Sequence, residues 1–217
     1  MAVELYDDHE QGERVRRWLQ SNGISIVLAV VLALGGVFGF QQYQANQLNN
    51  QSAAANYFNT IQQLIDADQL EMAEDYYERL QSVDQGGFYV LASIAMATGY
   101  VEAGRLAPAA SLYQTLWDEG DMASFKGLIG LRLARLLNGQ GDHGAALDVV
   151  SGPAPIGYEG AWAEARGDIH YDLGDMDQAR VAYQQALDSP DDMGFGSSLL
   201  QMKFDATGPG QLASEAP

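Results

Sequence analysis

The longest apolar run of the chain lies near its N-terminus. Residues 23–40 read GISIVLAVVLALGGVFGF, eighteen residues with no charged side chain and one hydroxyl. A helix of this length spans about 27 Å, close to the ~30 Å hydrocarbon core of a bilayer. A buried core helix would normally show a polar face, and this segment has none. The pattern therefore predicts one transmembrane helix over residues 23–40.

A cleaved signal peptide is the alternative interpretation of this run. Ala53, Ala54 and Ala55 supply an A-x-A pattern of the kind that signal peptidases cut. However, the run exceeds the ~7–15 apolar residues of a signal peptide, and the alanines lie well beyond its end. The run is therefore interpreted as a retained anchor.

Basic residues predict how the anchor is oriented. Arg14, Arg16 and Arg17 precede the apolar run, and no further Lys or Arg occurs until Arg79. Positive residues near a membrane helix favour the cytoplasmic side. We therefore expect a single-pass inner-membrane protein of a bacterium, with its N-terminus in the cytoplasm and its C-terminal part in the periplasm. A G-x-x-x-G spacing, Gly35 to Gly39, would also allow two anchors to approach closely.

Beyond residue 53, apolar positions follow a repeating helical pattern. In its clearest copy the small residue Gly167 is followed by a turn at Gly174, then by Ala179 and Tyr183. Corresponding turn residues, 36, 37 and 33 positions apart, are Asp68, Gly104, Gly141 and Gly174. This period resembles the tetratricopeptide repeat, a pair of antiparallel helices in about 34 residues.

Each residue type in the pattern has a packing role. Small residues let neighbouring helices lie close together, and we expect this of Ala73, Ala97, Ala109, Ala134, Ala146, Gly167 and Ala179. Larger residues, Tyr77, Tyr113 and Tyr183, are expected to fill the space between pairs. Helix breakers separate the pairs at residues 86–87, 119–121 and 152–155, and Pro153 should shorten the helix before it.

The predicted fold is therefore all-α, with a single N-terminal transmembrane helix followed by a tetratricopeptide-repeat-like solenoid of about four helix pairs. A generic helical bundle remains the alternative. The predicted parts are a cytoplasmic tail (1–22), the transmembrane helix (23–40), a juxtamembrane segment (41–52), the periplasmic repeat domain (53–205) and a flexible tail (206–217). Residues 191–205 are expected to form a short helix that caps the last repeat, because solenoid ends need a polar cover.

Charge and composition exclude some classes of partner. The formal net charge is −18, with 29 Asp and Glu against 11 Lys and Arg. Nucleic-acid binding depends on cations that neutralise phosphates, so we expect no nucleic-acid partner. The chain has no cysteine, which excludes disulfides, thiolate metal sites and a cysteine nucleophile.

Motifs of catalysis or cofactor binding are missing or out of context. A G-x-G-x-x-G spacing at Gly139, Gly141 and Gly144 follows a helical pattern, whereas dinucleotide binding needs a preceding strand. No nucleophile elbow or P-loop occurs. The sequence therefore predicts that the protein is not an enzyme and binds no cofactor.

Metal sites are not predicted either. His9, His143 and His170 are solitary, and His170 is expected to be a packed or groove-lining side chain. Three aspartates, Asp172, Asp175 and Asp177, resemble part of a calcium loop but lack its Gly and closing Glu. A solvated turn before a helix is the preferred interpretation of these aspartates.

A repeat solenoid offers a concave groove instead, lined by the first helix of each pair. Helical phase places these residues in a partner-binding groove: Phe58, Ile65, Leu91, Ile94, Val101, Leu128, Leu131, Arg135 and Tyr171. Glu164, Asp168 and Asp172 would add an acidic rim at the last unit. The competing interpretation is that the apolar members pack against the next helix.

Three stretches resemble a known family. They are ELYDDHEQGERVRRWLQSNG (4–23), RGDIHYDLGDMDQARVAYQQAL (166–187) and LLQMKFD (199–205). With the anchor and repeats between them, the chain resembles the YfgM family, ancillary subunits of the SecYEG translocon, over nearly its full length. The resemblance implies association with the translocon and with a PpiD-like periplasmic chaperone. It also implies a link between the cytoplasmic tail and an RcsB-like stress-response regulator.

The leading hypothesis is therefore a non-enzymatic accessory subunit of SecYEG that binds partners through its groove and helps pass exported polypeptides to periplasmic chaperones. A membrane-anchored scaffold of another cell-envelope assembly machine is the alternative. An enzyme with an unrecognised site is a third hypothesis, and the residues give it no support.

Overall fold

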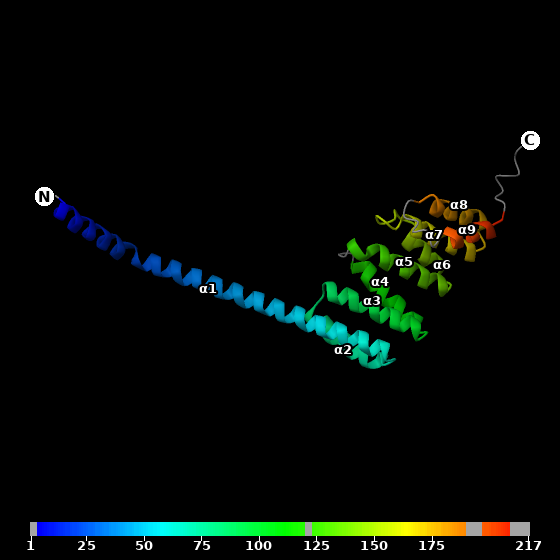
Figure 1. Cartoon of the computed structure of the whole chain (residues 1–217), viewed down its shortest axis with the longest axis horizontal. Helices are drawn as coiled ribbons and strands as arrows, with labels where there is room; N and C mark the ends of the chain where they lie inside the picture. Colours follow the sequence, from blue (N-terminus) through cyan, green and yellow to red (C-terminus); the bar gives the residue numbers. More distant parts are fainter. Residues whose placement is uncertain (1–3, 120–122, 190–196, 209–217) are drawn as a thin grey trace, which may run out of the picture. The chain divides into compact units, whose positions relative to one another are not determined.

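The computed structural model describes residues 4–119, 123–189 and 197–208 of the chain. Within these ranges every regular element is an α-helix (Figure 1). The helices are α1 (Glu4–Asp66), α2 (Leu70–Val83), α3 (Gly87–Glu102), α4 (Leu106–Glu119), α5 (Ala123–Gly139), α6 (His143–Val150), α7 (Glu159–Asp172), α8 (Met176–Leu187) and α9 (Ser197–Ala206). The all-α prediction is confirmed.

The chain divides into two compact units, Met1–Ala53 and Ala54–Pro217. Helix α1 runs through the expected boundaries at residues 22, 40 and 52 without a break and ends inside the second unit. Its large apolar side chains between Val27 and Phe40 are exposed, as expected for residues that face lipid. Among the described residues, one helix is long and apolar enough to cross a membrane, within Val27–Asp66. This fits a single-pass membrane anchor.

The second unit, the repeat domain, is built from helix pairs. The end of α1 lies beside α2, with the ring centroids of Tyr57 and Tyr76 6.1 Å apart (Figure 1). The pairs α3–α4, α5–α6 and α7–α8 follow, and a tight turn connects the two helices of each pair. The predicted turn residues all have positive φ: Asp68 (56°), Gly104 (72°), Gly141 (82°) and Gly174 (78°). Glycine adopts this conformation without a steric cost, which explains three of the four residues.

Aspartates that follow two of these glycines begin the next helix. Asp142 accepts a hydrogen bond from the Ala145 backbone amide at 3.1 Å, and Asp175 accepts one from Gln178 at 3.3 Å. Each side chain satisfies an amide that has no partner inside its own helix. The Gly-Asp dipeptide therefore ends one helix and starts the next, and Asp175 is a helix cap as expected.

Small residues bring the helices close together at the predicted positions. The predicted alanines are fully buried, and Tyr77, Tyr113 and Tyr183 are 8%, 2% and 2% exposed. A Cβ atom added to Gly167 would lie 2.4 Å from the Tyr183 ring, so only glycine fits there. The burial expected of these residues is confirmed, and Tyr183 packs against Gly167 within its own pair, α7–α8.

The lengths of the later helices follow from local sequence. Helix α6 has 8 residues, whereas α2 and α4 each have 14, because the segment 151–158 after α6 contains Pro153 and Pro155. The expected capping helix is α9, Ser197–Ala206, and it packs on α8. Residues 191–196, the start of the expected cap, and residues 209–217 of the expected tail lie outside the described residues.

Two apolar clusters fill the repeat domain. The larger one, the N-terminal cluster, extends from Ile61 of α1 to Trp162, Ala165 and Ile169 of α7. The smaller one, the C-terminal cluster, contains Ala163, Ala179, Tyr183, Ala186 and Leu200, with Leu187 and Phe204 against them. Helix α7 contributes to both clusters, so it joins the last helix pair and α9 to the rest of the domain.

Candidate functional site

A cavity of about 590 Å³ opens between the C-terminal end of α5, helix α7 and helix α9. We refer to it as the C-terminal groove. The residues that line it are Arg135, Asn138, Gly139, Ala165, Asp168, Ile169, Tyr171, Asp172, Tyr183, Leu199, Met202, Lys203 and Ala206. Helices α5 and α7 are the first helices of the last two pairs, and α9 follows α8 in the place where another first helix would come. The groove therefore lies on the side of the repeats where partner binding is expected.

Four predicted groove residues meet in this cavity: Arg135 from α5, and Asp168, Tyr171 and Asp172 from α7. Glu164 lies one turn before Asp168 on α7, and its carboxylate binds Lys203 beside the cavity. Residues on different helix pairs thus converge on one hollow surface. That these residues bind a partner stays a prediction.

The other predicted groove residues lie elsewhere, and most of them contact neighbouring helices. Phe58, Ile65 and Ile94 are half-buried against the N-terminal cluster, and Leu131 is a buried member of it. The Phe58 ring centroid lies 6.2 Å from that of Phe88. Leu128 is half-buried, while Leu91 and Val101 are 37% and 40% exposed, and none of these three lines the cavity.

Helix α9 contributes groove residues that the sequence reasoning did not single out. Leu199, Met202, Lys203 and Ala206 recur at helical spacing on one face of this helix and line the cavity. The sequence predicts a helix here, so helical spacing identifies these residues as one face of it, as it does in the repeats. Asn138, three residues after Arg135 on α5, could have been found in the same way.

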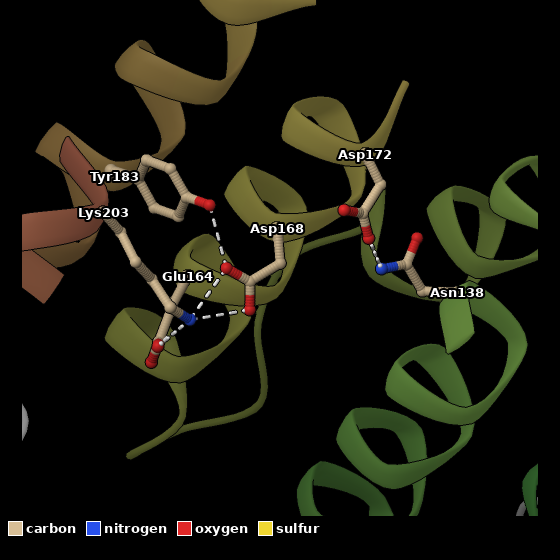
Figure 2. A network of polar contacts seen from close by, with 6 residues as sticks. All are labelled: Asn138, Glu164, Asp168, Asp172, Tyr183 and Lys203. Carbon is tan, nitrogen blue, oxygen red and sulfur yellow. Dashed lines mark hydrogen bonds and ion pairs between the residues drawn. The ribbon is translucent and has the colours of Figure 1, made fainter. Parts of the chain in front are cut away.

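Lys203 joins α9 to α7 through two carboxylates (Figure 2). Its Nζ atom lies 2.6 Å from Glu164 Oε1, and 2.8 and 2.9 Å from the two carboxylate oxygens of Asp168. Burial disfavours the charged lysine, but the hydrogen bonds to Asp168 and Glu164 outweigh it and raise the pKa of Lys203. Lys203 is therefore a charged clamp that holds α9 on the last repeat.

Tyr183 completes this cluster of polar groups. Its hydroxyl donates a hydrogen bond to Asp168 Oδ1 at 2.9 Å. Burial, and then the charge of Asp168, raise the pKa of Tyr183, so the hydroxyl keeps its proton and remains a donor. Asp168 thus has partners on both α8 and α9, which leaves it little capacity to bind a ligand.

Asp172, one turn further along α7, has a different environment. Asn138 Nδ2 donates a hydrogen bond to Asp172 Oδ2 at 2.6 Å, as Figure 2 shows. Asn138 Oδ1 lies 2.7 Å from His143 Nδ1, so that imidazole nitrogen donates to it. The Asp172 side chain is exposed and receives one hydrogen bond from the described residues, which leaves its other acceptor positions open toward the groove.

Arg135 is also exposed at the groove. It makes no hydrogen bond or ion pair with any residue in the described part of the chain. Each other Lys or Arg in residues 54–217 does contact a described residue, through an ion pair, a hydrogen bond or an aromatic ring: Arg79, Arg105, Lys126, Arg132, Arg166, Arg180 and Lys203. The groove therefore presents one uncommitted cation and one largely uncommitted carboxylate, on different helices.

The other candidate chemistry from the sequence does not form a ligand set. Where the chain is described, no three His, Cys, Asp or Glu side chains come together as they would around a metal ion. His143 is engaged with Asn138. His170 is half-buried on α7, with Nδ1 3.9 Å from Asp175 Oδ2, and it does not line the groove. The arrangement is suited to binding an apolar and charged partner segment.

Comparison with known proteins agrees with this architecture. A family model described as a tetratricopeptide repeat-like domain matches residues 16–209. A protein of Escherichia coli (strain K12), named ancillary SecYEG translocon subunit, is 28% identical over 93% of this chain and 98% of its own length. No solved structure matches the chain at a significant level.

Two further relatives carry the same name. The protein of Haemophilus influenzae is 24% identical over 87% of this chain and 92% of its own length. That of Aggregatibacter actinomycetemcomitans is 25% identical over 86% of this chain and 91% of its own length. The similarity therefore includes both the anchor and the repeats.

Proposed function

Because the chain belongs to the YfgM family of tetratricopeptide repeat-like proteins, we propose that it is a non-enzymatic ancillary subunit of the SecYEG translocon. The observation that carries this proposal is the similarity to relatives of that name over 93% of the chain. The fold alone would not suffice, because repeat solenoids serve many kinds of partner. The apolar helix of the first unit supports a position in the membrane, beside a membrane channel.

We further propose that residues 1–22 are cytoplasmic, residues 23–40 span the inner membrane and the domain from residue 53 is periplasmic. The basic residues Arg14, Arg16 and Arg17 before the span, and their absence directly after it, support this orientation. The intervening segment 41–52 is helical and uncharged, so it can connect membrane and domain as a continuation of α1. In this orientation the C-terminal groove would meet polypeptides that leave the channel.

In this proposal the domain receives exported polypeptides and helps pass them to a PpiD-like chaperone on the periplasmic side. A second, independent role belongs to the cytoplasmic tail, which would restrain an RcsB-like regulator. Val15, Trp18 and Leu19 support a contact there, since all three are more than half exposed on α1. Exposed aromatic and aliphatic side chains of this kind are typical of protein contacts.

Site-specific photo-crosslinking in intact membranes tests the proposed function. The crosslinking residue is placed at Tyr171 or Met202, which line the groove and are 40% and 67% exposed, and at Val181, which is 50% exposed but lies outside it. We expect products with SecYEG components, exported chains or a periplasmic chaperone from the groove positions, and few from Val181. Purification in mild detergent that recovers cell-wall synthesis enzymes without SecYEG would instead support the scaffold alternative.

A further inference from the structure

We propose that the C-terminal groove selects polypeptide segments that combine apolar side chains with lysine or arginine. The inference rests on the proposed function, which supplies the kind of occupant, an exported polypeptide. It adds the chemistry of the segment that binds. Three features of the groove support it: exposed apolar side chains, the charge of the domain around them, and two charges that make no ion pair with described residues, those of Arg135 and Asp172.

The apolar part of the site is formed mainly by α9 and α7. Leu199 and Met202 are 54% and 67% exposed, and Tyr171 is 40% exposed, although all three line one cavity. Large apolar side chains that share a hollow surface and remain exposed are typical of binding sites. Methionine is flexible and adapts to differently shaped partners, which suits a site that meets many sequences. The groove can thus accept leucine-like side chains without strict shape selection.

The charge of the domain determines which apolar segments are favoured. Residues 54–217 contain eight Lys and Arg against 24 Asp and Glu, a net charge of −16. Because the net charge is strongly negative and most of these cations already contact other groups of the domain, the electrostatic field outside the domain is negative. Such a field attracts cationic segments and repels acidic ones, and a cleft with apolar walls concentrates the effect. An apolar segment that carries lysine or arginine is therefore favoured over an equally apolar acidic one.

Asp172 gives this preference a specific contact. Its carboxylate is exposed at the groove and accepts one hydrogen bond, from Asn138. A carboxylate can accept several more, so Asp172 can receive a lysine or arginine of the occupant. Asp168 and Glu164 do not compete for this role, because Lys203 already binds both of them.

Arg135 lines the groove from α5, one helical turn before Asn138. Its guanidinium has no partner among the described residues and would repel a cation placed beside it. The occupant's basic residue is therefore directed to the α7 wall, while an acidic or hydroxyl side chain is favoured near α5. The two charges thus set the orientation of the bound segment.

The test uses full-length protein in nanodiscs of phosphatidylcholine, which has no net charge and so does not attract basic peptides. The probe is a short fluorescent peptide in which leucine and lysine alternate within a glycine-serine background. Matched peptides replace each lysine by glutamate or each leucine by serine. We expect anisotropy titrations to show about tenfold tighter binding of the leucine-lysine peptide than of either matched peptide. Tighter binding of the glutamate peptide, or equal binding of all three, would overturn the proposal.

Variants locate the binding site. D172R should weaken binding of the leucine-lysine peptide by about tenfold, and D172N, which keeps a hydrogen-bond acceptor for Asn138, by several-fold. The matched control D148R makes the same charge change at an exposed position on α6, outside the groove. An equal loss in D148R would show that the overall field alone attracts the peptide, and the proposed site would be wrong.

R135E should strengthen binding by several-fold, and R79E, an equal charge change on α2, should leave it within about twofold. M202S should weaken binding with an unchanged unfolding midpoint, because this side chain is 67% exposed.

Co-purification of SecYEG with the wild type is measured in parallel. If SecYEG co-purifies but the peptide preference is absent, the inference fails and the proposed function stands. If SecYEG does not co-purify with the wild type, the proposed function itself is rejected.

Discussion

The two ends of the repeat domain are stabilised in different ways. In the N-terminal cluster, large side chains such as Ile61, Leu80 and Trp162 are almost fully buried. In the C-terminal cluster, three of the five buried residues are alanines, and Lys203 connects the helices through carboxylates instead. One end is thus held mainly by apolar packing, and the other by a small apolar core with a charged clamp.

This difference explains where the groove is open. First helices that carry Phe58, Ile94 and Leu131 use these residues to contact neighbouring helices, because buried apolar area stabilises the fold. Where the same face carries Arg135 and Asp172, burial would cost free energy, and the cavity stays accessible. Equivalent positions in a repeat can therefore serve either packing or binding, depending on the side chains they carry.

The largest expected effect concerns the N-terminal cluster. Trp162 is 1% exposed, and its ring lies 6.3 Å from that of Trp117. W162A should lower the free energy of unfolding by about 3–5 kcal/mol, because the cavity cannot close fully. The free energy of unfolding is measured by urea titration of the full chain in detergent, with circular dichroism as the signal.

The matched control for this variant is V181A, at a position that is 50% exposed on α8. It should change the free energy of unfolding by less than about 0.5 kcal/mol. A cost of W162A no larger than that of V181A would contradict the conclusion that apolar packing stabilises this end of the domain.

The second prediction concerns the charged clamp. K203M leaves Glu164 and Asp168 without their cation and should cost about 1.5–3 kcal/mol, the range for hydrogen bonds to charged groups. The control K126M removes a lysine that lies over the Trp117 ring at 5.1 Å and should cost about 1 kcal/mol or less. Equal stability of K203M and wild type in the same assay would mean that the charged clamp does not stabilise the packing of α9 on the last repeat.

The third prediction concerns close packing in the C-terminal cluster. In G167A the new methyl group would meet the Tyr183 ring at 2.4 Å, and the tyrosine hydroxyl is fixed by Asp168. We expect a loss of about 1–3 kcal/mol from this overpacking. G144A on α6 is the control: its nearest atom would be 3.9 Å away, and alanine should stabilise the helix by about 0.5–1 kcal/mol. Thermal unfolding should therefore shift in opposite directions for the two variants.

The sequence was sufficient for features that depend on residues close together in the chain. The turns at Gly141 and Gly174 follow from glycine conformation and from the capping aspartates beside them. The apolar run from residue 23 to residue 40 was likewise evident from composition alone. Local geometry fixes these features whatever the rest of the molecule does.

The groove could not be predicted in the same way, because it depends on residues far apart in the chain. Helical phase placed Glu164 and Asp168 on the groove face, but it could not show that Lys203, 39 and 35 positions later, would bind them. Nor could it show whether Ile94 or Leu131 would face a cavity or a neighbouring helix. Those outcomes depend on how closely successive pairs pack, which the side chains of several helices determine together.

The smallest expected effect concerns Tyr100 in the N-terminal cluster, whose hydroxyl should make the stability of the protein depend on pH in the alkaline range. The Tyr100 hydroxyl donates to Glu74 Oε1 at 2.8 Å, and burial, together with this carboxylate, raises the pKa of Tyr100 to about 12. In the unfolded chain a tyrosine loses its proton near pH 10. Between these values the unfolded state binds fewer protons than the folded state, so the free energy of unfolding falls as pH rises.

Y100F tests this dependence. Near pH 8 the variant should be less stable than wild type by about 1 kcal/mol, the value of one hydrogen bond, while Glu74 keeps its ion pair with Arg105. Because phenylalanine does not titrate, this difference should shrink as pH rises from 10 to 12. Y171F is the control, since that side chain is 40% exposed and its hydroxyl has no hydrogen bond within the described part of the chain. A stability difference between Y100F and wild type that stays constant up to pH 12 would mean that the Tyr100 hydroxyl is not held as a proton donor in the folded state.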